Sequence, residues 1–241
     1  MMNYRDVTLC KMALASFMYD SLTSYNKSLR RLDEATGRSI DLSNVEHRKA
    51  LIKWLNDWGC RHLSKKYHEV ASDNILNWYD VDGTRLFTDK KPLWELGDDE
   101  LEVAVNAYGS LKDKTGAWRD RGGRKQEVPI GEVAASKILF AIRRRALMPW
   151  DNEMQRHFQC DGNPKSYRSY LRNIKELTLH IGSLCRNKGF QIDDLPAELG
   201  RPESTVLELI NEYVWITVPR KNGKKIELPS SRTVARWAAL G

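Results

Sequence analysis

The sequence predicts a mainly α-helical fold with one or two short β-hairpins, and three observations support this prediction. Apolar residues recur at the three- and four-residue spacing of a helix through most of the 241 residues. Residues typical of helix starts and stops bracket several of these segments. The chain has no internal repeat or low-complexity segment. A chain of this length buries about 70–75% of its unfolded surface, so its core needs no disulfide or metal.

The first half of the chain contains three predicted helices. Residues 7–32 carry apolar side chains at helical spacing and end in a basic run. A capping box formed by Ser43 and Glu46 precedes an apolar run and predicts a helix over 43–62. A further helix is expected around 64–78. The pair Asp82-Gly83 between apolar flanks then predicts a short hairpin.

The second half is predicted from acidic, glycine and proline signals at the ends of apolar segments. We expect a helix opened by the acidic stretch 95–102, then a glycine-rich basic loop over 116–127 and an apolar helix over 131–147. A short helix follows Asp151, and a long helix starts at Asn163-Pro164 and ends before Gly189. A helix over 203–213 comes next, and the tail forms a hairpin from 214–218, the turn Asn222-Gly223 and 226–228.

Charge and composition limit the classes of partner and location. The formal net charge of +7 favours a polyanion such as nucleic acid. No apolar run approaches the ~20 residues that span a bilayer, and the first residues lack the apolar stretch of a signal peptide, so we expect a cytoplasmic protein that does not bind membranes. The four cysteines are scattered and are expected to be free thiols. Cys60 and His62 stand two residues apart and diverge on a helix, so no metal or other cofactor is expected.

The most informative segment covers residues 128–158, VPIGEVAASKILFAIRRRALMPWDNEMQRHF. A turn that contains Pro129, Ile130 and Gly131 leads into an apolar helix, and Asp151 caps the next helix. The start of a helix presents backbone N–H groups that can hold a DNA phosphate without reading sequence. The three turn residues are therefore candidate contacts to the DNA backbone.

This segment resembles the helix-hairpin-helix DNA glycosylases, the superfamily of endonuclease III and the adenine-mismatch glycosylases. Members carry a Pro/Gly hairpin, a buried helix and then an aspartate some twenty residues later. Here Asp151 follows Gly131 by twenty residues, with Met154 at +3 and Arg156 at +5 as is common in the family. The resemblance covers about 30 of the 241 residues.

The resemblance implies a two-lobed fold that acts on double-stranded DNA. One lobe, with the helix-hairpin-helix, would span 40–150, and the other would combine 1–39 with 151–241, with the site between them. Asp151 would be the catalytic carboxylate, in addition to capping its helix. A fixed anion stabilises the positive charge that develops on the sugar when an N-glycosidic bond breaks, and it can also activate the attacking water.

The segment departs from the family in three ways. Only Gly131 is clear where two glycines are usual. Val133 occupies the position of the family's Schiff-base lysine, which favours a monofunctional enzyme without lyase activity. Lys137, one turn further along, is the alternative nucleophile if the register differs, and otherwise its ammonium would reach solvent along the helix. The cysteine quartet that binds an iron–sulfur cluster in some members is absent.

Further candidates come from residue type. Basic residues expected to contact DNA phosphates are Arg119, Arg121, Arg124 and Lys125 in the loop, with Arg145 and Arg156. Flipping a base out of the helix requires aromatic faces on which it can stack. The candidate pocket walls are Trp150, Trp78, Trp94 and Trp118, for each of which core packing is the alternative.

The sequence leaves the substrate open among oxidised, alkylated and mismatched bases and a bulky modified base of phage DNA, which would imply antiviral defence instead of repair. A non-catalytic helix-hairpin-helix DNA-binding protein is the main alternative, and an all-α interaction protein is the second. Motifs of the GxxxxGK[ST], GxSxG and HExxH kinds are absent. A monomer without an obligate protein partner is expected.

Overall fold

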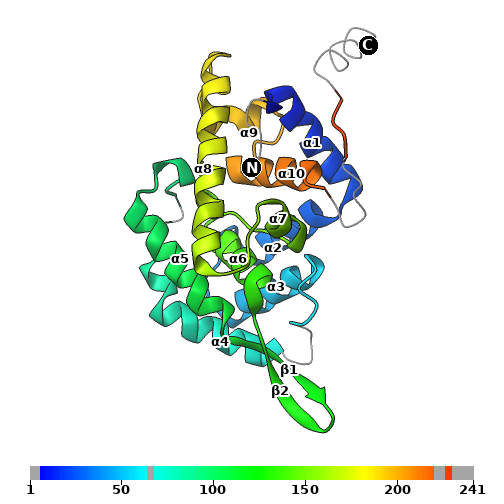
Figure 1. Cartoon of the computed structure of the whole chain (residues 1–241), viewed down its shortest axis with the longest axis vertical. Helices are drawn as coiled ribbons and strands as arrows, with labels where there is room; N and C mark the ends of the chain where they lie inside the picture. The colour runs from blue at the N-terminus through cyan, green and yellow to red at the C-terminus, as the bar shows by residue number, and fades with distance from the viewer. Residues whose placement is uncertain (1–5, 64–67, 89, 220–225, 230–241) are drawn as a thin grey trace.

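The computed structural model describes residues 6–63, 68–88, 90–219 and 226–229, and these residues are mainly helical, as predicted (Figure 1). None of the described helices is both long and apolar enough to span a membrane. The elements are α1 (Leu9–Leu22), α2 (Tyr25–Thr36), α3 (Val45–Asp57), α4 (His68–Val81), α5 (Asp98–Lys112), β1 (Thr115–Arg121), β2 (Arg124–Pro129), α6 (Gly131–Ile142), α7 (Asn152–His157), α8 (Pro164–Arg186), α9 (Leu195–Glu198) and α10 (Val206–Thr217).

The amino-terminal segment forms two helices where 7–32 predicted a continuous one. The break lies at Thr23, whose backbone is extended and whose hydroxyl donates to the Tyr19 carbonyl at 2.8 Å. Threonine and serine hydroxyls compete with the helical ladder in this way, and Ser24 follows directly. The break brings the rings of Tyr19 and Tyr25 to a centroid distance of 6.0 Å, one on each helix.

Two predictions in the next segment are corrected. The cap of α3 is Asn44, which accepts from the Glu46 N–H at 2.9 Å, whereas the Ser43 hydroxyl donates to Asp41 at 2.6 Å. The hairpin at Asp82-Gly83 is wrong, because the Asp82 N–H still bonds the Trp78 carbonyl and a 3-10 turn follows. The helix α4 therefore ends at Val81, directly before the 3-10 turn at Gly83–Arg85.

The glycine-rich basic segment 116–127 is an antiparallel β-hairpin, not a loop. Gly122 and Gly123 have φ of 61° and 80°, the left-handed pair that a two-residue hairpin turn requires. The turn at Pro129–Gly131 therefore follows a strand, so the two helices around it, α5 and α6, are joined by a β-hairpin where a basic loop was expected. The hairpin projects away from the helices in Figure 1.

The helix α6 ends at Ile142, before the three arginines that the 131–147 prediction included. Each arginine leaves the helix for a separate partner. Arg143 donates to the Phe87 carbonyl at 2.6 Å, Arg144 to Asp33 at 3.0 Å, and Arg145 to Asp193 at 2.7 Å. The three arginines therefore bond residues elsewhere in the fold instead of extending α6 by another turn.

The carboxyl-terminal helices follow their caps more closely. Asp151 caps α7 and Asn163 caps α8, with Pro164 in the first turn, as predicted. The helix α10 continues through Thr217, so the predicted first strand at 214–218 is wrong. The turn Asn222-Gly223 lies outside the described residues, and 226–229 form no strand. Val214 and Ile216 are buried in the core, where α10 packs against α1.

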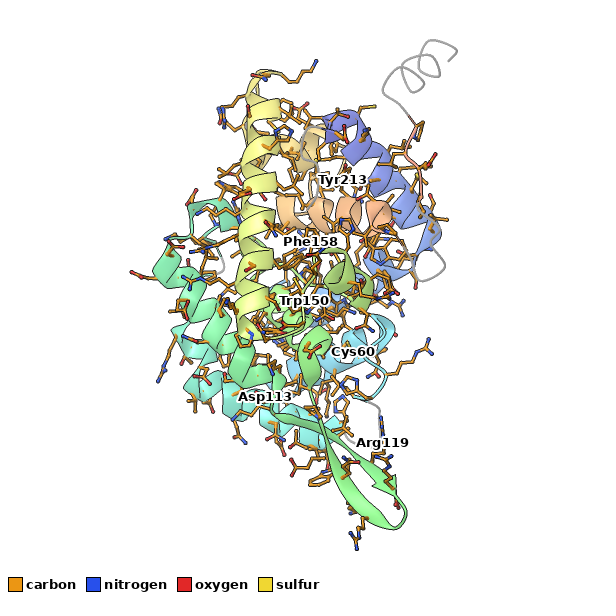
Figure 2. All side chains as sticks on the ribbon, in the orientation of Figure 1. Cys60, Asp113, Arg119, Trp150, Phe158 and Tyr213 are labelled. Carbon is orange, nitrogen blue, oxygen red and sulfur yellow. The ribbon has the colours of Figure 1, made fainter. Side chains whose placement is uncertain are left out.

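The buried apolar side chains form one continuous cluster that draws on both halves of the chain. Figure 2 shows these side chains filling the space between the helices, with Trp150 near the centre. The cluster includes residues from 40–150 and from the two flanking ranges, so the division into two lobes remains a prediction. All four cysteines are free thiols, as predicted.

Candidate functional site

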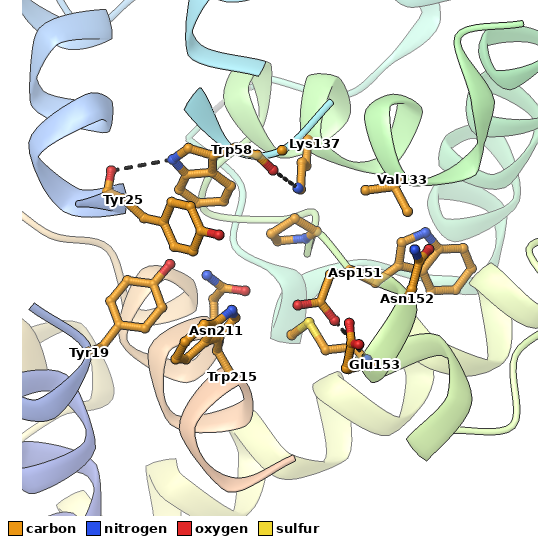
Figure 3. A pocket seen from close by; sticks show the side chains of 14 residues that line it. Tyr19, Tyr25, Trp58, Val133, Lys137, Asp151, Asn152, Glu153, Asn211 and Trp215 are labelled. Carbon is orange, nitrogen blue, oxygen red and sulfur yellow. Dashed lines mark hydrogen bonds between the residues drawn. The ribbon is translucent and has the colours of Figure 1, made fainter. Parts of the chain in front are cut away.

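A cavity of about 210 Å³ lies beside the start of α7, and we call it the Asp151 cavity (Figure 3). Its lining residues come from five helices and from the segments beside them, both within 40–150 and outside that range. They are Tyr19, Tyr25, Trp58, Gly59, Val133, Lys137, Pro149, Trp150, Asp151, Asn152, Glu153, Met154, Asn211 and Trp215.

Aromatic rings form one wall of this cavity. Tyr19 lies edge-on to Trp215 with centroids 5.3 Å apart, and Tyr25 lies 5.4 Å from Trp58 and 6.1 Å from Trp215. The Trp58 indole is held in place because its N–H donates to the Ser28 hydroxyl at 2.9 Å. Such a wall of fixed rings offers faces on which a flat ligand can stack.

Asp151 is half-buried at the opposite side of the cavity. Its Oδ1 accepts from the Met154 N–H at 2.8 Å, which fixes the orientation of the carboxylate (Figure 3). The backbone of Asp151 is extended, as an N-cap residue requires, so the cap and the position in the cavity coexist.

Lys137 also lines this cavity, so its ammonium does not reach solvent as the alternative expectation held. The residue is 6% exposed, and its Nζ donates to the Trp58 carbonyl at 2.5 Å and lies 5.7 Å from the centre of the Trp58 ring. Val133 lines the cavity one helical turn earlier. Both positions considered for the nucleophile therefore lie on one face of α6. Burial raises the pKa of the nearby Cys60 thiol, which disfavours the reactive thiolate.

The turn residues lie in different environments. Pro129 is exposed and Gly131 has a φ of 80°. Ile130 is fully buried, and its carbonyl lies 2.9 Å from Nε2 of His62. If this turn contacts a phosphate, its backbone groups and the neighbouring residues would make the contact, because the Ile130 side chain is buried in the core.

The basic residues of the β-hairpin divide between its two faces. The register pairs Arg119 with Gln126 and Arg121 with Arg124, so these four side chains share one face. Lys125 pairs with Asp120 on the other face. All six residues are exposed. We call the first set the arginine face, and none of its arginines forms an ion pair within 4.0 Å among the described residues.

The other two basic candidates are paired. Arg145 bonds Asp193 and lines a separate cavity of about 80 Å³ that also includes Trp94. Arg156 bonds Glu153 at 2.6 Å, beside the Asp151 cavity. Of these two, only Arg156 lies near the predicted catalytic carboxylate.

Of the four tryptophans predicted as pocket walls, only Trp150 borders the Asp151 cavity. It is 1% exposed, and its N–H donates to the Glu132 carbonyl at 3.1 Å. Trp78 is fully buried and donates to the Ala107 carbonyl at 3.0 Å. Trp118 lies half-buried on β1, and Trp94 lines the separate cavity.

The side chains of the far wall were missed by sequence reasoning: Tyr19, Tyr25, Trp58, Asn211 and Trp215. They come from three stretches far apart in the chain, and no local motif joins them. Aromatic type was the available signal for four of them, and nothing in the sequence indicated Asn211.

No group of three or more His, Cys, Asp or Glu side chains that could hold a metal ion occurs in the described part of the chain. The chain matches no protein-family model, no curated protein and no solved structure.

Proposed function

We propose that this protein is a monofunctional DNA glycosylase that flips out a damaged or modified base and hydrolyses its glycosidic bond. The observation that carries the proposal is the Asp151 carboxylate, fixed by its helix cap at the edge of an aromatic cavity. An engineered protein cavity of about 150 Å³ holds benzene. A cavity of about 210 Å³ therefore admits one flat ring system.

The chemistry follows from this placement. The C1′–N bond breaks and its electron pair leaves with the base, which takes up a proton. The ionised Asp151 stabilises the positive charge on the sugar and accepts a proton from the water whose oxygen bonds to C1′. The products are a free base and an abasic site.

The arginine face supports DNA as the partner. Three exposed guanidinium groups on one side of a projecting hairpin can bind successive phosphates without reading bases. This contact would hold the duplex while one nucleotide enters the Asp151 cavity. Oxidised, alkylated, mismatched and phage-modified bases remain the candidate substrates.

Lys137 supports a second candidate, a glycosylase with lyase activity. Its amine lines the same cavity as Asp151, as an attacking nucleophile requires (Figure 3). After losing a proton, the amine would bond C1′ and displace the base. The C1′–O4′ bond would then break to give an imine, and loss of a proton from C2′ would expel the phosphate at C3′, which breaks the strand.

An abasic-site assay tests the proposal. Wild type, Asp151→Asn and the control Asp98→Asn, which alters an exposed carboxylate at the start of α5, are incubated with undamaged, oxidised, alkylated, mismatched and phage-modified duplexes. Alkali-dependent breaks with wild type and Asp98→Asn, and none with Asp151→Asn, are expected. Breaks before alkali that Lys137→Met abolishes would identify the lyase.

Two outcomes of these experiments would refute the proposal. If no duplex gives a product while salt-sensitive binding persists and Asp151→Asn leaves it unchanged, the protein is a non-catalytic DNA-binding protein. Full activity of Asp151→Asn would also refute the assigned mechanism.

A further inference from the structure

An amide in the Asp151 cavity has no hydrogen-bond partner among the described residues. Asn211 on α10 is 5% exposed, and its side chain makes no hydrogen bond to any described residue. Buried amides are almost always bonded, since an unmade hydrogen bond is costly. The neighbouring Glu212 follows this rule, because it accepts from Asn26 at 2.9 Å and from Arg201 at 3.1 Å. The Asn211 amide differs in that its polar atoms stay open to the cavity without a bond, and this arrangement needs a separate explanation.

The position of Asn211 provides that explanation. Its side chain rises from α10 into the cavity, between the aromatic wall of Tyr19 and Trp215 and the carboxylate of Asp151 (Figure 3). A flat ring stacked on that wall would present its edge near the amide. An amide offers one donor and one acceptor side by side, which matches an adjacent acceptor and donor on a ring edge.

We propose that Asn211 is a specificity-determining residue that bonds the polar edge of a nucleobase held in the Asp151 cavity. Asparagine makes paired bonds of this kind to the N6 and N7 edge of adenine. The inference rests on the proposed function in one respect: the nucleobase that enters the cavity would belong to a nucleotide flipped out of duplex DNA. The aromatic wall supplies stacking for any flat ring, and Asn211 selects those with a suitable edge.

Binding of free bases tests the inference without requiring catalysis. Adenine, guanine, cytosine and thymine are titrated into the full chain, and tryptophan fluorescence is followed because Trp58 and Trp215 line the cavity. Indole serves as a flat ring without an adjacent donor and acceptor. The variants are Asn211→Leu, which removes both bonds at similar size, and Asn211→Asp, which removes the donor. Asn77→Leu, an exposed asparagine on α4, is the matched control.

At least one base is expected to bind wild type, and Asn211→Leu is expected to weaken it by about tenfold or more. Indole binding should change by less than about twofold in the same variant, and Asn77→Leu should change neither. If thermal unfolding shows that Asn211→Leu is unfolded, weaker base binding by Asn211→Asp carries the test instead.

Two results would overturn the inference: no base binds wild type, or the folded Asn211 variants bind every base as wild type does. The outcome is separable from that of the abasic-site assay. Base binding that depends on Asn211, with no product from any duplex, would refute the glycosylase and leave the recognition role standing. Unchanged substrate selectivity in an active Asn211→Leu enzyme would refute the recognition role alone.

Discussion

The arginine face of the hairpin predicts a specific change in how duplex binding depends on salt. Replacing Arg119, Arg121 and Arg124 with glutamine removes three exposed cations from one face. Each phosphate neutralised by a protein cation contributes about 0.9 to the slope of log K against log salt. If each arginine contacts one phosphate, the triple variant loses about 2.7 from that slope. Between about 50 and 200 mM salt, wild-type affinity would then fall by about 40-fold more than that of the variant.

The measurement is fluorescence anisotropy of a labelled undamaged duplex at several salt concentrations. A second triple variant, with Lys27, Arg30 and Arg31 on α2 changed to glutamine, removes the same charge from exposed positions elsewhere. It should reduce the slope by less than about 1, because long-range effects of exposed charges are screened. Equal slopes for the two variants would refute the contact, since only the net charge would then matter. Thermal unfolding should show both variants folded, because substitutions at exposed positions usually change stability by less than about 0.5 kcal/mol.

Three predictions concern stability. Arg144→Met should destabilise the protein by about 3–5 kcal/mol in urea unfolding, because it removes the nearest cation from two nearly buried carboxylates, of which Asp33 keeps only Arg38 at 3.9 Å. Arg145→Met, which loses an exposed pair, should cost at most about 1 kcal/mol, and equal losses would contradict this account. Burial raises the pKa of Glu208 to about 7, so between pH 4.5 and 7 the folded state binds more protons than the unfolded state. The unfolding free energy should fall by about 3 kcal/mol as pH rises through this window. Glu208→Gln should remove most of that fall, and an unchanged profile would count against it. Trp150→Ala should cost about 3–5 kcal/mol and Trp118→Ala about 1 kcal/mol, because only Trp150 is fully buried. Similar melting temperatures for these two variants would show that Trp150 is not a core residue.

Side chains that act on their immediate neighbours in the sequence were sufficient to predict several helix boundaries. Asp151 and Asn163 cap their helices as predicted, because capping depends on one side chain and the next three backbone N–H groups. Two predictions were wrong because they, too, used only neighbouring residues. Val214 to Val218 has the β-branched and aromatic composition of a strand, but packing against α1 keeps Val214–Thr217 helical. Residues 116–127 lack the apolar alternation of a strand, yet Gly122-Gly123 closes them into a hairpin.

The candidate site was predictable only in part. The segment 128–158 indicated Asp151, Lys137 and Trp150, and all three line one cavity. The remaining wall depends on Tyr19, Trp58 and Trp215, which are separated by tens of residues or more. No periodicity connects such positions, because their proximity results from the way α1, α3 and α10 pack.

The sequence by itself determined the helical class and the caps Asp151 and Asn163, the first of which is the carboxylate at the start of α7, since each depends on neighbours along the chain. Only the tertiary structure decided that Lys137 enters the cavity of Asp151 and that the hairpin arginines share one face. It also decided that the Asn211 amide lies in this cavity with no hydrogen-bond partner among the described residues. These features arise where separate segments meet, and the free energy that brings the segments together comes from the burial of the whole apolar core.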